Sequence, residues 1–123
     1  MDRIEEVAFA QFPQLSIRRK QLAGTLSGGE QQMLALARAF ATDPKLLLLD
    51  ELSLGLAPIV VAELYEKVRQ LAAGGLSILL VEQFARTALP IADAAAVMLQ
   101  GIIAQQGSPS EMEEALSASY LGG

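Results

Sequence analysis

Ser27, Gly28 and Gly29 are the first residues in this chain whose types and spacing could do chemistry. Ser27 and Glu30 have the spacing of a capping box, in which the serine side chain accepts from a backbone N–H group and the glutamate reaches back. A helix is therefore predicted to begin at Gly28. The helix dipole, the uncovered N–H groups of the two glycines and the serine hydroxyl together favour a bound phosphate group.

Asp50 and Glu51 form the second group, about twenty residues further on. They follow the apolar run Leu46 to Leu49, which has the pattern of a central parallel strand. Because α/β sheets bind ligands at the carboxyl ends of their strands, Asp50 could hold Mg²⁺ directly or through water. Glu51 could then orient or deprotonate an attacking water molecule.

Both groups also have an ordinary structural interpretation. The tetrad Ser-Gly-Gly-Glu is compatible with a plain capped helix, and any buried strand must end in polar residues. The succession of the two groups favours the chemical interpretation, because Gln31 and Gln32 follow the tetrad and the acidic strand end comes next.

The elements that must position these groups form an α/β pattern. Helices are predicted over residues 2–11, from Gly28 to the Asp43-Pro44 dipeptide, and from Pro58 to the Gly74-Gly75 pair, with a turn or short helix between the first two. Strands 46–49 and 76–81 should pair in parallel and be buried on both faces. A short helix over 84–89, a hairpin with arms 95–99 and 102–106, and a last helix opened by a capping box of Ser108 and Glu111 complete the chain. The helix from Pro58 is expected to bury Val61, Leu64, Tyr65, Val68 and Leu71.

Composition excludes several chemistries. The chain has 123 residues, 52% of them hydrophobic, and neither cysteine nor histidine, which excludes disulfides, thiolate metal sites and histidine catalysis. No apolar run reaches the roughly 20 residues that span a bilayer, and the first residues lack a secretory pattern, so a cytoplasmic location is expected. The net charge of -5 gives no basic footprint for nucleic acid, and the cluster Arg18-Arg19-Lys20 is interpreted as a solvated face.

From about Phe12 to Gly123 the chain resembles the C-terminal half of an ABC transporter ATPase, most of all the second ATPase subunit of branched-chain amino-acid uptake systems. The strings that carry the resemblance are QLAGTLSGGEQQMLALARA, LLLLDE, SLGLAP, LLVEQ and the ending YLGG. The resemblance implies an α/β fold, the C-terminal part of a P-loop NTPase domain, with a parallel β-α-β core and a C-terminal hairpin plus helix. Residues 1–42 would be the end of the helical subdomain with the signature helix, and residues 43–123 the Walker B half of the nucleotide-binding core.

The same resemblance implies roles and partners. Two ATPase subunits would face each other head to tail, and the signature of each would contact ATP held by the other. Asp50 would hold Mg²⁺ and Glu51 would be catalytic on their own side, and Gln83, at the position of the usual switch histidine, could donate a hydrogen bond to a phosphate. An ordinary strand-end amide is the alternative for Gln83. The signature residues are Ser27, Gly28, Gly29, Glu30 and Gln31.

The chain departs from the family pattern in several places. Leu52 replaces the usual proline after the catalytic glutamate, which should loosen the backbone there. Ala57 replaces an aspartate that signals across the subunit interface in many relatives, and Pro90 should end a helix that is usually continuous. The largest departure is that no loop of the type GxxxxGKS or GxxxxGKT occurs, so the Walker A half is missing and the chain is expected to be a fragment that does not bind ATP tightly alone.

Three functions are compatible with this pattern. The first is the ATP-binding and ATP-hydrolysing subunit of an ABC importer for branched-chain amino acids, with ATP and Mg²⁺ as cofactors and transmembrane permease subunits as partners at the inner face of the membrane. The second is a non-catalytic interaction fragment, which the missing Walker A loop favours. The third is an ABC ATPase of DNA repair or translation, which the acidic charge disfavours. No membrane span of its own is expected.

Overall fold

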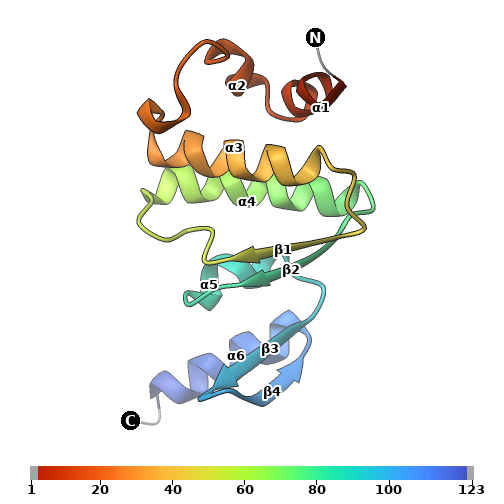
Figure 1. Cartoon of the computed structure of the whole chain (residues 1–123). Helices are drawn as coiled ribbons and strands as arrows, with labels where there is room; N and C mark the ends of the chain where they lie inside the picture. Colours follow the sequence, from red (N-terminus) through yellow and green to blue (C-terminus); the bar gives the residue numbers. More distant parts are fainter. Residues whose placement is uncertain (1–2, 122–123) are drawn as a thin grey trace. The chain divides into compact units, whose positions relative to one another are not determined.

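The computed structural model describes residues 3–121, with side chains described as far as residue 117, and it divides into two compact units, Met1–Val81 and Glu82–Gly123. In the first unit, helices α1 (Arg3–Gln11), α2 (Pro13–Ile17) and α3 (Gly28–Phe40) precede strand β1 (Leu46–Asp50), helix α4 (Pro58–Ala73) and strand β2 (Ser77–Val81) (Figure 1). A single 3₁₀ turn, η1 (Ala23–Thr25), leads into α3. The predicted helix over 2–11 is confirmed from Arg3 onward, and Asp2 lies outside the described residues.

Helices α3 and α4 pack side by side in the first unit, and α1 and α2 pack against α3 (Figure 1). The sequence prediction for α4 is confirmed in full, because all five expected residues of its apolar face are buried. Pro13 begins α2 instead of only ending the preceding helix, since the first turn of a helix needs no N–H donor. Phe12, between α1 and α2, is fully buried.

Strands β1 and β2 pair in parallel, as predicted, with Leu46 opposite Ser77 and Asp50 opposite Val81. The expectation that both strands are buried on two faces is wrong. Leu47 is only 6% exposed, whereas its neighbour Leu48 is 65% exposed, and the cross-strand partner Leu79 is 55% exposed. Within the described part of this unit the sheet has two strands, and of the adjacent Leu47 and Leu48 side chains only that of Leu47 is buried. Alternate side chains therefore remain in solvent.

The second unit contains helix α5 (Ala85–Ala88), the 3₁₀ turn η2 (Leu89–Ile91), strands β3 (Ala95–Leu99) and β4 (Ile102–Gly107), and helix α6 (Pro109–Leu121). The short helix predicted over 84–89 gives way to η2 around Pro90, as expected of a residue without an N–H group. The antiparallel hairpin is confirmed, and its turn places Gln100 and Gly101 at φ 49° and 80°, the left-handed conformations that two-residue hairpin turns use.

Helix α6 packs against both strands of the hairpin and begins with the predicted capping box. The Ser108 N–H donates to Glu111 Oε2 at 2.7 Å, and the Glu111 N–H donates to Ser108 Oγ at 3.3 Å. These bonds hold the pKa of Glu111 below its usual range. Of the resemblance-bearing ending YLGG, Gly122 and Gly123 lie outside the described residues. No described helix combines the length and the apolar character needed to cross a bilayer.

Candidate functional site

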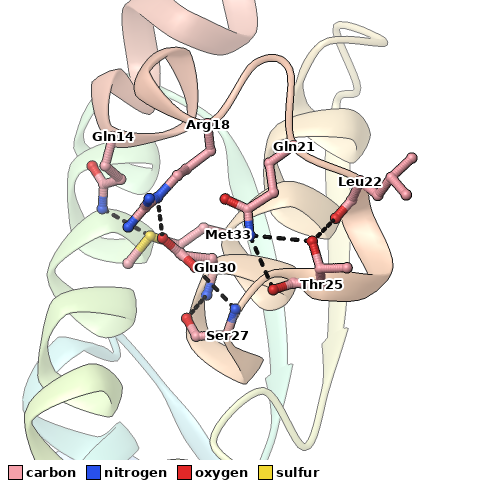
Figure 2. A network of polar contacts seen from close by, with 8 residues as sticks. All are labelled: Gln14, Arg18, Gln21, Leu22, Thr25, Ser27, Glu30 and Met33. Atoms are coloured by element: carbon pink, nitrogen blue, oxygen red, sulfur yellow. Dashed lines mark hydrogen bonds and ion pairs between the residues drawn. The ribbon is translucent and has the colours of Figure 1, made fainter.

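The entrance of α3 is built as the sequence predicts. The Ser27 side chain accepts from the Glu30 N–H at 3.3 Å, and Glu30 Oε2 accepts from the Ser27 N–H at 2.9 Å, so both halves of the capping box are present (Figure 2). The Gln31 side chain donates to the Leu26 carbonyl at 3.1 Å, which holds the residue just before the cap. The side chains of Glu30 and Gln31 therefore hydrogen-bond to the backbone at the helix entrance.

Three donors at this entrance are left for a ligand. The N–H groups of Gly28 and Gly29 lie in the first turn, where no intrahelical acceptor exists, and no acceptor for them is found in the described part of the chain. The Ser27 hydroxyl accepts from Glu30 but can still donate its proton. With the positive end of the helix dipole, these donors suit a phosphate oxygen.

The pKa of Glu30 is held below its usual range, first by the hydrogen bond from the Ser27 backbone N–H, then by the nearby Ser27 side chain, and then by Arg18. The Arg18 Nε donates to Glu30 Oε1 at 3.1 Å (Figure 2). Arg18 was interpreted from the sequence as part of a solvated face. Its partner is twelve residues away on another helix, so no local spacing could have indicated this contact.

Gly29 is buried against α4. A Cβ atom on residue 29 would overlap the Val60 Cγ1 methyl group, and one on Gly28 would lie 3.2 Å from Leu56 Cδ2. The second glycine of the motif is therefore needed for close packing of α3 on α4, whatever ligand the entrance binds.

Glu51 lies immediately after β1 with φ 49°, a left-handed conformation that costs a residue with a side chain. Its N–H donates to the Val81 carbonyl at 2.9 Å, and its carbonyl accepts from the Leu54 N–H at 3.1 Å, so its backbone is fixed on both sides. Asp50 and Glu51 are both exposed. Leu52 is buried, so packing holds the turn in the place where the family uses proline.

Asp50 lines a small pocket between α3 and β1, with a volume of about 190 Å³. Gln32 of α3 lines the same pocket, whereas Ser27, Gly28 and Gly29 do not, so the structure does not place the entrance of α3 and Asp50 in one pocket. Gln83 belongs to the second unit and is exposed. Its position relative to Asp50 and Glu51 therefore stays a prediction.

A metal ion has few protein ligands here. Among the described residues, no three aspartate, glutamate, histidine or cysteine side chains gather into a group that could hold one. Mg²⁺ is usually held by one or two carboxylates together with substrate phosphates, so Asp50 fits Mg²⁺ as part of such a shared site.

A glycine-opened, serine-capped helix followed by a parallel strand-helix-strand unit with acids at the strand end is the arrangement that the resemblance to ATP-binding cassette proteins implies. Residues 2–53 match the protein family described as ABC transporter. A solved structure of an ATP-binding cassette of an ABC transporter superposes with a TM-score of 0.85 and 32% identity, covering 95% of this chain and 47% of the other.

Two curated relatives are similar over most of this chain. It is 46% identical to the high-affinity branched-chain amino acid transport ATP-binding protein BraG of Pseudomonas aeruginosa, over 100% of this chain and 52% of the relative. It is 34% identical to the lipopolysaccharide export system ATP-binding protein LptB of Escherichia coli K12, over 85% of this chain and 44% of the relative. The chain belongs to the family of ATP-binding proteins of ABC transporters and spans about half the length of the curated relatives it matches.

Proposed function

We propose that this chain is part of the ATP-binding and ATP-hydrolysing subunit of an ABC importer for branched-chain amino acids. The observation that carries the ATPase proposal is the entrance of α3, where the capping box leaves the Ser27 hydroxyl and two glycine N–H groups as uncommitted donors. The 46% identity to a branched-chain amino acid transport protein supports the choice of solute. Because the chain also matches a lipopolysaccharide export protein, transport of other solutes has to be tested as well.

In the proposed mechanism, Ser27, Gly28 and Gly29 bind the γ-phosphate of ATP held by a second ATPase subunit in a head-to-tail dimer. Negative charge grows on the phosphate oxygens during transfer, and donors that are already in place stabilise it without reorganisation. Glu30 and Gln31 keep the backbone of this entrance in position rather than contacting phosphate themselves.

Asp50, Glu51 and Gln83 act on the ATP bound on their own side. Asp50 would hold Mg²⁺, which would supply positive charge that neutralises the phosphates. Glu51, fixed at the end of β1 by its bonds to Val81 and Leu54, orients the attacking water or accepts its proton. Gln83 donates a hydrogen bond to a phosphate oxygen and stays neutral at every pH, so this position supplies no pH gate.

Permease subunits in the membrane are the proposed partners, which would place the protein at the inner face of the membrane without a span of its own. Binding of this chain to vesicles that contain a branched-chain amino acid permease, but not to vesicles without it, would support this assignment. Equal binding to both kinds of vesicle would contradict it.

The role of Glu51 is tested in a subunit that joins this sequence to a Walker A half. Glu51→Gln removes the proton acceptor and keeps the shape, so we expect ATP hydrolysis to fall at least about 100-fold while ATP binding persists. Glu63→Gln, an exposed glutamate on α4 outside the site, is the matched control. Hydrolysis by Glu51→Gln at the rate of Glu63→Gln would exclude Glu51 as the catalytic residue.

A non-catalytic interaction fragment is the second candidate, favoured by the absence of a GxxxxGKS or GxxxxGKT loop from the chain. Because the chain is not expected to bind ATP tightly alone in either case, ATP hydrolysis by the subunit that joins it to a Walker A half separates the two. Hydrolysis that Glu51→Gln abolishes would contradict the fragment proposal, and ATP binding without any hydrolysis would support it.

A further inference from the structure

The Glu30 carboxylate contacts two different segments at once. Its Oε2 atom accepts from the Ser27 N–H at 2.9 Å, and its Oε1 atom accepts from Arg18 Nε at 3.1 Å (Figure 2). Both oxygens belong to one planar group, so the position of Arg18 constrains the orientation that Glu30 presents to Ser27.

Arg18 is itself held in place by its surroundings. It is the C-cap residue of α2, and its N–H donates to the carbonyl of Leu15, a buried residue, while the Arg19 N–H donates to the Ser16 carbonyl. The next residue, Arg19, pairs with Glu5 of α1 at 2.8 Å between Nη2 and Oε2. The two arginines therefore connect the turn after α2 to α1 on one side and to the entrance of α3 on the other.

One other side chain reaches α3, since Gln14 Nε2 of α2 donates to Met33 Sδ at 2.8 Å, beyond the capping box, and the contacts of Gln21 and Thr25 stay within their own segment. The Gln21 side chain donates to the Thr25 carbonyl at 3.0 Å, and the Thr25 hydroxyl donates to the Leu22 carbonyl at 2.8 Å (Figure 2). These bonds fix η1 locally but do not reach Ser27. Among the side-chain contacts of the residues that the structure describes, the one from Arg18 to Glu30 connects α2 to the capping box.

We propose that Arg18 is a positioning residue for the phosphate site of Ser27, Gly28 and Gly29, and that it acts through the Glu30 carboxylate. This inference rests on the proposed function of that site. It makes the geometry of the donors depend on where α2 lies, so a movement of α2 changes how well the entrance of α3 binds phosphate.

The test uses the 123-residue chain and two measurements by NMR. Amide hydrogen exchange at Ser27 reports how often its N–H leaves Glu30, and titration with pyrophosphate reports binding through the shifts of the Gly28 and Gly29 N–H signals. We expect Arg18→Gln to speed Ser27 exchange about two- to fivefold, the range for an exposed ion pair, and to weaken pyrophosphate binding by a similar factor. Arg18→Lys, which keeps the charge but not the directed Nε–H group, should recover part of the loss.

Two further variants test whether Arg18 acts on Ser27 through Glu30. Lys20→Gln removes an exposed cation two residues away and should change neither measurement. Glu30→Gln keeps an oxygen for the Ser27 N–H but removes the charge that Arg18 contacts, so Arg18→Gln should have little added effect in that background.

The proposal is overturned if Arg18→Gln behaves like Lys20→Gln, or if its effect persists unchanged when Glu30 is already glutamine. If Arg18→Gln speeds Ser27 exchange but pyrophosphate shifts no glycine signal even in the unsubstituted chain, the connection from Arg18 to Ser27 is supported and the proposed phosphate site is contradicted. The positioning role of Arg18 and the proposed phosphate site can therefore be contradicted independently of each other.

Discussion

Gly29 in α3 lies so close to Val60 in α4 that a Cβ atom on residue 29 would overlap the Val60 Cγ1 methyl group. A glycine that the sequence marks as part of a phosphate site thus has a packing role of its own. Phosphate binding and helix packing depend on the same residue, and suitable substitutions can separate them.

Gly29→Ala should destabilise the first unit by about 1–3 kcal/mol, because the added methyl group forces α3 and α4 apart. The gain in helix propensity from alanine offsets only part of this cost. Urea unfolding measures the change. Adding Val60→Ala should restore part of the stability, and Gly24→Ala, where nothing lies within 4 Å, is the control. A Gly29→Ala chain as stable as the Gly24→Ala chain would contradict the packing role.

Ser27→Asp should separate capping from phosphate binding. Aspartate caps a helix as well as serine does, so the free energy of unfolding should stay within about 0.5 kcal/mol of the original, whereas Ser27→Ala should lose about 1 kcal/mol. The carboxylate repels anions, so pyrophosphate should no longer shift the Gly28 and Gly29 signals in the aspartate variant. Retained pyrophosphate binding by Ser27→Asp would exclude the site as described.

Glu51→Gly should leave the fold intact or stabilise it by up to about 1 kcal/mol. The left-handed backbone costs a residue with a side chain roughly 1–2 kcal/mol, which exceeds the entropy that glycine adds to the unfolded chain. Thermal and urea unfolding measure this. Gln100→Gly, at the same φ of 49° in the hairpin turn, should change stability in the same direction, and Glu51→Gln should not change it. A loss above 1 kcal/mol in Glu51→Gly would show that the Glu51 side chain stabilises the fold.

Leu48 and Leu79 face each other across the uncovered side of the sheet, 65% and 55% exposed. Exposed apolar patches of this kind promote self-association, so the chain should form oligomers as its concentration rises. Replacing the pair by Leu48→Lys and Leu79→Glu should reduce association, measured by sedimentation velocity, without loss of stability. Leu47→Lys, on the covered face, should instead unfold the unit. Unchanged oligomers in the double variant would show that another surface is responsible.

Glu66 should titrate far below a usual glutamate. Two hydrogen bonds from the Arg69 guanidinium, followed by one from Gln70, lower its pKa from 4.5 to about 2. Since the folded pKa is depressed, the stabilising contribution is present above pH 4.5 and is lost as the pH falls toward 2. Carbon-13 NMR titration of the side-chain carboxyl measures the pKa. Arg69→Gln should raise the Glu66 pKa most of the way back to 4.5. Lys67→Gln should raise it less, because Lys67 contributes least to the lowered pKa. Equal effects of the two substitutions would contradict the role of Arg69.

Local patterns in the sequence were enough to predict α3, α4 and the hairpin. Each of these signals depends on residues a few positions apart: the capping boxes at Ser27 and Ser108, Pro58 in the first turn of α4, and the Gln100-Gly101 turn. The spacing of apolar residues in α4 likewise predicts which face of that helix is buried. The position of the two acids was predicted for the same reason, because the apolar run over residues 46–49 indicates a strand that they follow, and the structure extends β1 by one residue to Asp50.

The sequence by itself therefore determined the longer helices, the strands and their order, while the residues that it names for phosphate binding stay a prediction. Only the tertiary structure decided that Leu48 is exposed while Leu47 is buried, since burial depends on which faces other elements cover. It also decided that Gly29 touches Val60 and that Arg18 contacts Glu30, because each contact joins helices that are distant in sequence. The left-handed backbone of Glu51 is set by its bonds to Val81 and Leu54, and the long-range bond to Val81 exists only once β1 and β2 have paired.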